Sequence, residues 1–131
     1  MIRRLVFAGV LVCILASPAF AQAPKGLRAA MQSRDSAVAT ADVATWDRLT
    51  AETFTVVQAD GILLTKAERI TQMKTQKPSP MGAHEGEEIN RYGDVFVRRF
   101  LAGDIWVLDV WAKQSGGWRV VAVQVTTAKK K

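Results

Sequence analysis

GDIWVLDVWAKQSGGWRVVAVQVTT, residues 103–127, is the segment of the sequence that decides the fold. Side chains alternate on either side of Ser115-Gly116, which is the pattern of two strands joined by a two-residue turn. Both faces of this hairpin are rich in apolar residues. An apolar face needs cover, so the sequence predicts a sheet that is buried on both of its faces.

The predicted turn at Ser115-Gly116 sets the pairing of the two strands. Counting outward places Trp111 opposite Val120 and Asp109 opposite Ala122. One face is then mixed in polarity and contains Val107, Asp109, Trp111, Lys113, Trp118, Val120, Ala122 and Gln124. The other face is more uniformly apolar and contains Trp106, Leu108, Val110, Val121, Val123 and Val125.

A second hairpin is predicted with Ala102-Gly103 as its turn. This turn sets Phe100 opposite Ile105 and brings Phe96, Arg98 and Phe100 onto the mixed face. An error of one residue in either register would exchange the two faces.

The N-terminal half is predicted to be mainly helical. Apolar residues recur at helical spacing over residues 25–41, with Arg28, Arg34 and Asp35 between them. Asp42 is placed as the N-cap of a second, short helix that carries Trp46 and Leu49.

The middle of the chain changes from strand to helix. Residues 53–57 are β-branched and aromatic, and the turn residues 59–61 lead into a short apolar segment at 62–64. Thr65 and Glu68 form a predicted capping box at the start of a helix, which the prolines within 77–82 must end. Strand candidates then follow at 87–92, 94–101, 104–113 and 118–127, and helices before an antiparallel meander indicate an α+β fold.

Residues 1–21 have the form of a cleaved secretory signal peptide. Arg3 and Arg4 precede an apolar segment of about 12 residues, which is too short to cross a membrane, and Ala19-Phe20-Ala21 is a small-x-small cleavage site. We therefore expect a secreted, periplasmic protein with no membrane contact after cleavage. It would consist of one domain over residues 22–128 and a lysine tail at 129–131.

The charge and cysteine content exclude several classes of site. Of the net charge of +6, two charges belong to the predicted signal peptide and three to the lysine tail, so the predicted domain is almost neutral. Nucleic acid is therefore not expected as a partner, because phosphate binding needs a basic surface on the folded domain. Cys13 is the one cysteine and lies in the signal peptide, which leaves no thiol for a disulfide, a zinc site or a nucleophile.

Several segments together resemble the nuclear-transport-factor-2-like (NTF2-like) superfamily. They are RYGDVFV from Arg91, WVLDVWAK from Trp106 and GGWRVVAVQVTT from Gly116, preceded by the DG turn and the TKAE helix start. Within the superfamily the chain is most similar to the SnoaL-like branch and to its secreted group, domain of unknown function 4440. The resemblance implies a cystatin-like cone, in which a strongly curved antiparallel sheet wraps the helices and leaves a pocket. Members include isomerases, cyclases, dehydratases, hydrolases and binding domains, so the resemblance does not choose a reaction.

On this fold the mixed face would line the pocket, and the apolar face would need another cover. A small apolar molecule is the expected ligand, and the apolar face is expected to form a homodimer. The candidate ligand-binding residues are Trp46, Phe54, Phe96, Arg98, Phe100, Trp111, Trp118, Gln124 and Thr126.

Asp109 is the candidate catalytic residue, because a carboxylate in a central strand is costly to bury without a partner. It could act as a general base or contact a ligand, or it could simply pair with Arg98. No cofactor and no metal are expected. His84 lies in an acidic loop that matches no metal-ligand spacing, and Lys66, Arg69, Lys74 and Lys77 are expected to form a solvated helix surface.

Three functions remain open on the sequence alone. The first is a binding protein for a small apolar molecule. The second is a metal-free SnoaL-like enzyme that uses Asp109 on an apolar substrate. The third is an interaction module that contacts other chains through its sheet.

Overall fold

The computed structural model describes residues 23–131 and has an α+β fold in which one curved sheet packs against helices on one side. The predicted signal peptide therefore lies outside the described residues. In chain order the elements are α1 (Lys25–Thr40), α2 (Val43–Arg48), β1 (Thr50–Val57), β2 (Leu63–Thr65), α3 (Lys66–Thr75), β3 (His84–Tyr92), β4 (Val95–Ala102), β5 (Ile105–Gln114) and β6 (Gly117–Thr127). Within residues 23–131, none of the helices has the length and apolar character needed to cross a membrane.

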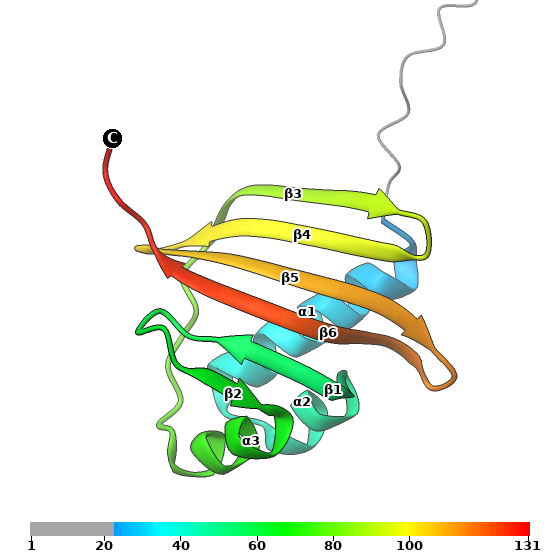
Figure 1. Ribbon diagram of the computed structural model, residues 1–131, viewed down its shortest axis with the longest axis horizontal. Helices are drawn as coiled ribbons and strands as arrows, with labels where there is room; N and C mark the ends of the chain where they lie inside the picture. Colours follow the sequence, from blue (N-terminus) through cyan, green and yellow to red (C-terminus); the bar gives the residue numbers. More distant parts are fainter. Residues whose placement is uncertain (1–22) are drawn as a thin grey trace, which may run out of the picture.

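The six strands form a single sheet in the order β2-β1-β6-β5-β4-β3. Strands β3 to β6 form the predicted antiparallel meander, whereas β1 pairs in parallel with β6. Figure 1 shows α1 crossing behind the sheet, with α2 and α3 next to β1 and β2. We call the sheet face toward α1 the inner face and the opposite one the outer face.

The predicted helix starts are confirmed. The side chain of Asp42 accepts a hydrogen bond from the Thr45 backbone amide at the start of α2. Thr65 and Glu68 form a complete capping box at the start of α3, which satisfies amides that have no partner within the helix. The helix α1 ends at Thr40, one residue before the predicted boundary.

The β4–β5 turn lies one residue later than predicted. Ala102 pairs with Ile105, so the turn residues are Gly103 and Asp104, and Arg98 pairs with Asp109 rather than with Val107. Gly103 has a φ of +61°, a left-handed conformation that glycine adopts without strain. The pairing shifts by two residues, which keeps each side chain on its predicted face.

The β5–β6 hairpin contains a bulge that the sequence prediction missed. The predicted pairs hold from Gln114–Gly117 to Trp111–Val120, but Val110 then pairs with Ala122 and leaves Val121 as the extra residue. Beyond the bulge the predicted faces of β6 are therefore exchanged. The expectation that Gln124 and Thr126 lie on the inner face with Asp109 is wrong, because Asp109 pairs with Val123.

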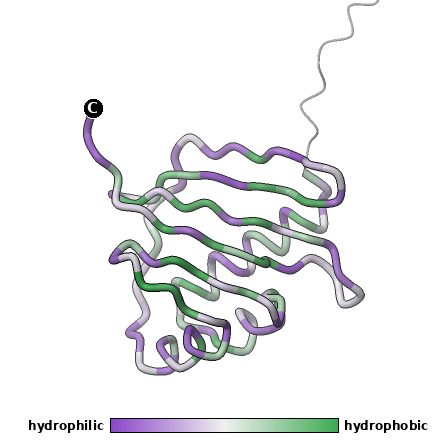
Figure 2. Tube along the Cα trace, viewed as in Figure 1, coloured by the Kyte–Doolittle hydropathy of each residue, from purple (hydrophilic) through white to green (hydrophobic). Residues whose placement is uncertain are grey.

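The core lies between the three helices and the inner face of the sheet. Its largest fully buried apolar side chains are Leu27, Trp46, Phe54, Met73, Phe100, Trp111 and Val120. In Figure 2 the central strands are mainly hydrophobic, whereas the edge strand β3 is hydrophilic along much of its length. The edge strand thus exposes polar residues, and the central strands carry the core.

Candidate functional site

A pocket of about 480 Å³ lies between α1 and the inner face of the sheet. Most of the residues that line it are apolar, and they are Val38, Trp46, Phe54, Val56, Ala59, Met81, Phe100, Ile105, Val107, Val123 and Val125. Its polar lining comes from Arg34, Asp35, Gln58, Asp60, Arg69, Arg98 and Asp109. The exposed residues Ala59 and Asp60 mark its opening to solvent.

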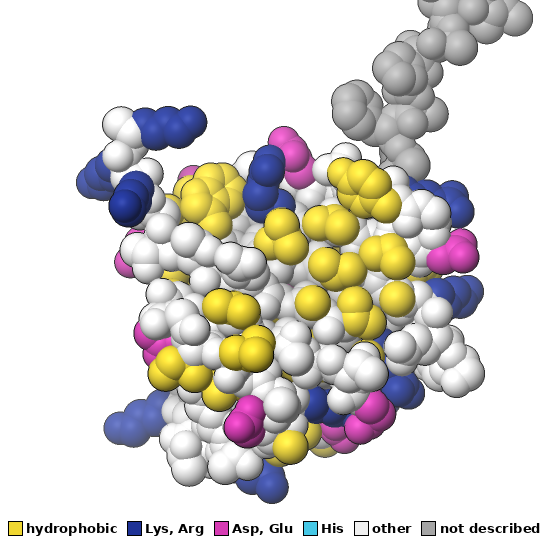
Figure 3. Space-filling view, in the orientation of Figure 1, with side chains coloured by type: hydrophobic (Ala, Val, Ile, Leu, Met, Phe, Trp, Pro, Cys, Tyr) yellow, Lys and Arg dark blue, Asp and Glu magenta, His cyan; other side chains and the backbone are white. Residues whose placement is uncertain are grey.

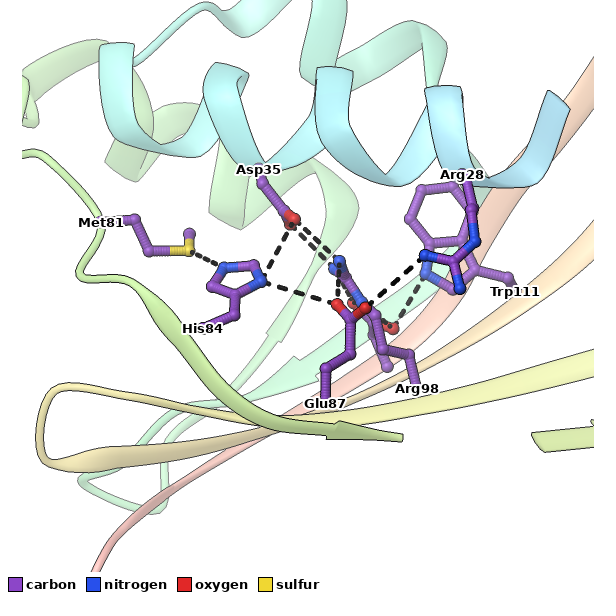
Figure 4. A network of polar contacts seen from close by, with 8 residues as sticks. Arg28, Asp35, Met81, His84, Glu87, Arg98 and Trp111 are labelled. Carbon is purple, nitrogen blue, oxygen red and sulfur yellow. Dashed lines mark hydrogen bonds and ion pairs between the residues drawn. The ribbon is translucent and has the colours of Figure 1, made fainter. Parts of the chain in front are cut away.

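Arg98 forms a buried ion cluster with Asp35 and Asp109. Its Nη1 and Nη2 atoms donate to the two carboxylate oxygens of Asp35 over 2.7 and 2.8 Å. Nη2 also donates to Oδ2 of Asp109 over 2.6 Å, and Nε lies 3.2 Å from both oxygens of Asp109. Trp111 completes the contacts of Asp109 by donating from Nε1 to Oδ1 over 2.9 Å. Figure 4 shows Arg98 lying between the sheet and Asp35 on α1.

Arg98 is held in its charged form. Burial lowers the pKa of Arg98, but the hydrogen bonds to Asp35 and Asp109 raise it by more, so its pKa lies above the ordinary value. Removing either carboxylate would leave buried charge without its partner. The cluster therefore fixes α1 against β4 and β5 at the floor of the pocket.

Arg34 is a second buried guanidinium in the pocket, and it has a different environment. Its exposed fraction is 6%, and among residues 23–131 its Nε has no hydrogen-bond partner. The guanidinium carbon lies 5.4 Å from the centre of the Trp46 ring and 5.6 Å from that of Phe54, within the range of cation–π attraction. Burial lowers the pKa of Arg34 to about 10, although the charges of Asp109 and Asp35 act to raise it. Arg34 is thus still charged at neutral pH.

Arg69 on α3 brings a third guanidinium to the pocket. Its Nη1 donates to the side-chain oxygens of Gln72 and Gln76 over 2.7 and 3.0 Å, and burial lowers its pKa. The prediction of a solvated helix surface is therefore wrong for Arg69. It is also wrong for Lys66, which is buried against Asp47 and Glu52 at 2.8 and 2.7 Å.

The structure brings half of the predicted site residues together. Those that line the pocket are Trp46, Phe54, Arg98, Phe100 and Asp109. Trp111 is fully buried beside Asp109 and does not line it. Phe96 and Trp118 lie on the inner face but line a separate, smaller hollow with Lys113 and Pro24. Gln124 and Thr126 are exposed and lie outside the pocket, which corrects the prediction for both.

His84 does not lie in a solvated acidic loop as predicted. It opens β3, its ring stacks on Phe100 with ring centres 3.8 Å apart, and its Nε2 lies 3.1 Å from the sulfur of Met81. Its Nδ1 lies 3.9 Å from Asp35 and 3.7 Å from Glu87. Within the described part of the chain, no group of three or more histidines, cysteines or acidic residues is placed to hold a metal ion.

Arg34 and Asp35 line the pocket but were not among the predicted site residues, since they were expected only as polar residues between the apolar ones of the first helix. The signal was nevertheless present, because Leu27, Met31, Arg34 and Val38 follow the spacing of a single helix face. An arginine at a core position of an amphipathic helix indicates a buried polar contact.

Comparisons with known proteins identify the type of fold. A scan of the sequence against models of protein families gives no match, and neither does a comparison with curated proteins. Solved structures, in contrast, are similar over most of their length. An NTF2-like protein from Cytophaga hutchinsonii is 18% identical, with a TM-score of 0.69 over 77% of this chain and 94% of that one.

Two further structures agree with this likeness. A DUF3225 family protein of unknown function from Pectobacterium atrosepticum is 24% identical, with a TM-score of 0.67 over 79% of this chain and 89% of that one. A cystatin-like fold protein from Burkholderia xenovorans is 16% identical, with a TM-score of 0.67 over 81% of this chain and 92% of that one. The chain has an NTF2-like fold. Because these identities are low, the comparisons show the NTF2-like fold alone. Membership of the narrower SnoaL-like branch stays a prediction.

Proposed function

We propose that this NTF2-like protein binds a small, mostly apolar molecule in the pocket between α1 and the inner face of the sheet. The observation that carries the proposal is the pocket of about 480 Å³ with an apolar wall and a few buried polar groups. Ligand sites in proteins are typically of this size and composition. The polar groups would fix the orientation of the ligand, and the wall would supply most of the free energy of binding.

The hydrogen bonds that Asp109 accepts favour a binding function over a catalytic one. A general base needs an oxygen that can accept a proton from the substrate. Both oxygens of Asp109 already accept hydrogen bonds from Arg98 or Trp111. We therefore assign Asp109 a positioning role and place the SnoaL-like enzyme, with Asp109 as base, second.

Blocking the pocket tests the proposal. Val107 lines the pocket, whereas its neighbour Leu108 lies on the outer face with an exposed fraction of 40%. Val107→Phe should abolish the binding of two naphthalene probes, 2-naphthoate and 2-acetylnaphthalene, in isothermal titration calorimetry. Leu108→Phe is the matched control and should bind both like the wild type. Unchanged binding by Val107→Phe would place the probes elsewhere and contradict the proposal.

The outer face supports a second proposal, that two copies of the chain pair through their sheets. Trp106 and Leu108 are 38% and 40% exposed, and the neighbouring pairs Val97–Val110 and Val110–Ala122 are half-buried on the same face. Figure 3 looks onto this face and shows hydrophobic side chains gathered over the middle of the sheet. A dimer would remove this apolar surface from water. A monomer in sedimentation at micromolar concentration would contradict it.

Export is the third part of the proposal and rests on residues 1–21 of the sequence. Expression of the full chain in a bacterium should yield a periplasmic protein that begins at Gln22. Mass spectrometry of the periplasmic fraction measures this directly. An intact N-terminus in the cytoplasmic fraction would contradict it.

A further inference from the structure

Arg34 is a buried guanidinium in the pocket with an Nε donor that none of the described residues satisfies. A guanidinium has five N–H donors, and donors that are removed from water are costly when no acceptor replaces it. With an exposed fraction of 6%, Arg34 has little access to solvent, and no group within residues 23–131 accepts from its Nε. The rings of Trp46 and Phe54 attract the positive charge but accept no strong hydrogen bond.

The two carboxylates near Arg34 make their hydrogen bonds with other residues in the described structure. Asp35 accepts from both Nη atoms of Arg98, and Asp109 accepts from Arg98 and from Trp111. The charges of Asp35 and Asp109 still act on Arg34 at longer range, since both raise its pKa. Arg34 therefore has electrostatic compensation, but its Nε has no hydrogen-bond acceptor among residues 23–131.

The buried and half-buried charges of the pocket leave one positive charge in excess. Three guanidinium groups, from Arg34, Arg69 and Arg98, line the pocket with two buried or half-buried carboxylates, from Asp35 and Asp109. Asp60 also lines the pocket, but it is exposed, and its Oδ1 accepts from the amide of Ile62. A bound group with one negative charge would balance the excess positive charge of these buried and half-buried residues.

We propose that the pocket selects a ligand with one carboxylate joined to an apolar body, and that Arg34 binds the carboxylate. This inference rests on the proposed function, because it names the class of molecule that the same pocket takes. A carboxylate is planar and accepts two parallel hydrogen bonds from one guanidinium, and its single charge equals the excess. The apolar body would lie along Val107, Val123 and Val125.

The test compares two probes of nearly the same shape. In 2-acetylnaphthalene a neutral methyl ketone replaces the carboxylate of 2-naphthoate. By calorimetry at pH 7, the wild type should bind 2-naphthoate at least about tenfold more tightly, which is the usual effect of a hydrogen bond to a charged group. Arg34→Met should lose this preference and bind the ketone within about twofold of the wild type.

Arg28→Met is the matched control, because it removes the same charge from the same helix. The Arg28 side chain is 56% exposed and lies outside the Arg34 pocket. This variant should keep the full preference for 2-naphthoate. If Arg34→Met does not fold, Arg34→Lys tests the same point, since it retains the charge without the paired donors and should retain only part of the preference.

The possible outcomes separate this inference from the proposed function. Equal affinity of the wild type for both probes would keep the pocket as a binding site and overturn the selection of a carboxylate. A preference that survives in Arg34→Met would overturn the role of Arg34. Failure of both probes to bind would overturn the proposed function itself.

Discussion

Arg34 and Arg98 are buried guanidinium groups in the same pocket, and their surroundings predict opposite roles. Arg98 holds two carboxylates at 2.6 to 2.8 Å and joins α1 to the sheet. Arg34 has no such partner for its Nε within the described chain. A buried charge that has oppositely charged partners holds the elements of the fold together. A buried charge that lacks such partners lowers the stability of the fold, and a ligand that supplies one can offset this loss.

Asp109→Asn should lower the free energy of unfolding by about 3 kcal/mol, because it removes a buried charge that faces Arg98. Urea denaturation of the purified variant measures this change. Asp104→Asn, in the exposed β4–β5 turn, is the control and should change stability by less than about 0.5 kcal/mol. An Asp109→Asn protein as stable as the wild type would contradict the positioning role of Asp109.

Arg34→Met should raise the free energy of unfolding at pH 7 by about 1 kcal/mol or more, since it removes a charge that burial disfavours. Folding lowers the pKa of Arg34 from its ordinary value to about 10, so the folded chain binds this proton more weakly than the unfolded chain. The cost is therefore complete below about pH 10 and decreases as the pH rises above it. Urea denaturation of both proteins at pH 7 and pH 11 should show a smaller difference at pH 11. A wild type more stable than the variant at pH 7 would show that Arg34 stabilises the unliganded fold.

At the scale of elements, local sequence signals predicted where helices and strands begin better than how the strands pair. The capping box at Thr65 and the N-cap at Asp42 are local hydrogen-bond patterns, and both were predicted. The bulge at Val121 depends on how β6 fits between β5 and β1, which no short segment of sequence encodes. Five of the ten predicted site residues line the pocket, and the bulge explains why Gln124 and Thr126 do not.

Val123→Asp and Gln124→Asp test the face assignment beyond the bulge. The structure places Val123 in the buried inner face and Gln124 among the exposed residues. Val123→Asp should lower the free energy of unfolding by about 3 kcal/mol or more, because it buries an unpaired carboxylate. Gln124→Asp should lower it by less than about 1 kcal/mol. Thermal or urea denaturation distinguishes the two variants. A larger loss of stability in Gln124→Asp than in Val123→Asp would support the predicted register without the bulge.

At the scale of the whole molecule, the sheet separates the two proposed functions onto its two faces. The inner face lines the pocket, and the outer face carries the exposed apolar residues proposed to form the dimer. Because neighbouring residues of a strand point to opposite faces, a change on one face should leave the other unaffected.

Trp106→Glu combined with Leu108→Glu should convert the proposed dimer to a monomer, since four charges would enter each interface. Sedimentation velocity measures the change, and the affinity for 2-naphthoate should stay within about twofold of the wild type. Ile62→Glu is the control, because Ile62 is 54% exposed but lies in the loop before β2. A double variant that still sediments as a dimer would place the interface elsewhere.

The position of β6 in the sheet has a consequence for how the protein is made. This strand, residues 117–127, is the last of the six in chain order, yet it lies between β1 and β5 in the sheet. Until it arrives, β1 and β5 lack the neighbour that joins them, and the contact between β1 and β6 spans about half of the chain. A chain in which β6 has not yet joined the sheet therefore lacks part of the pocket wall, and ligand capture has to wait for this strand.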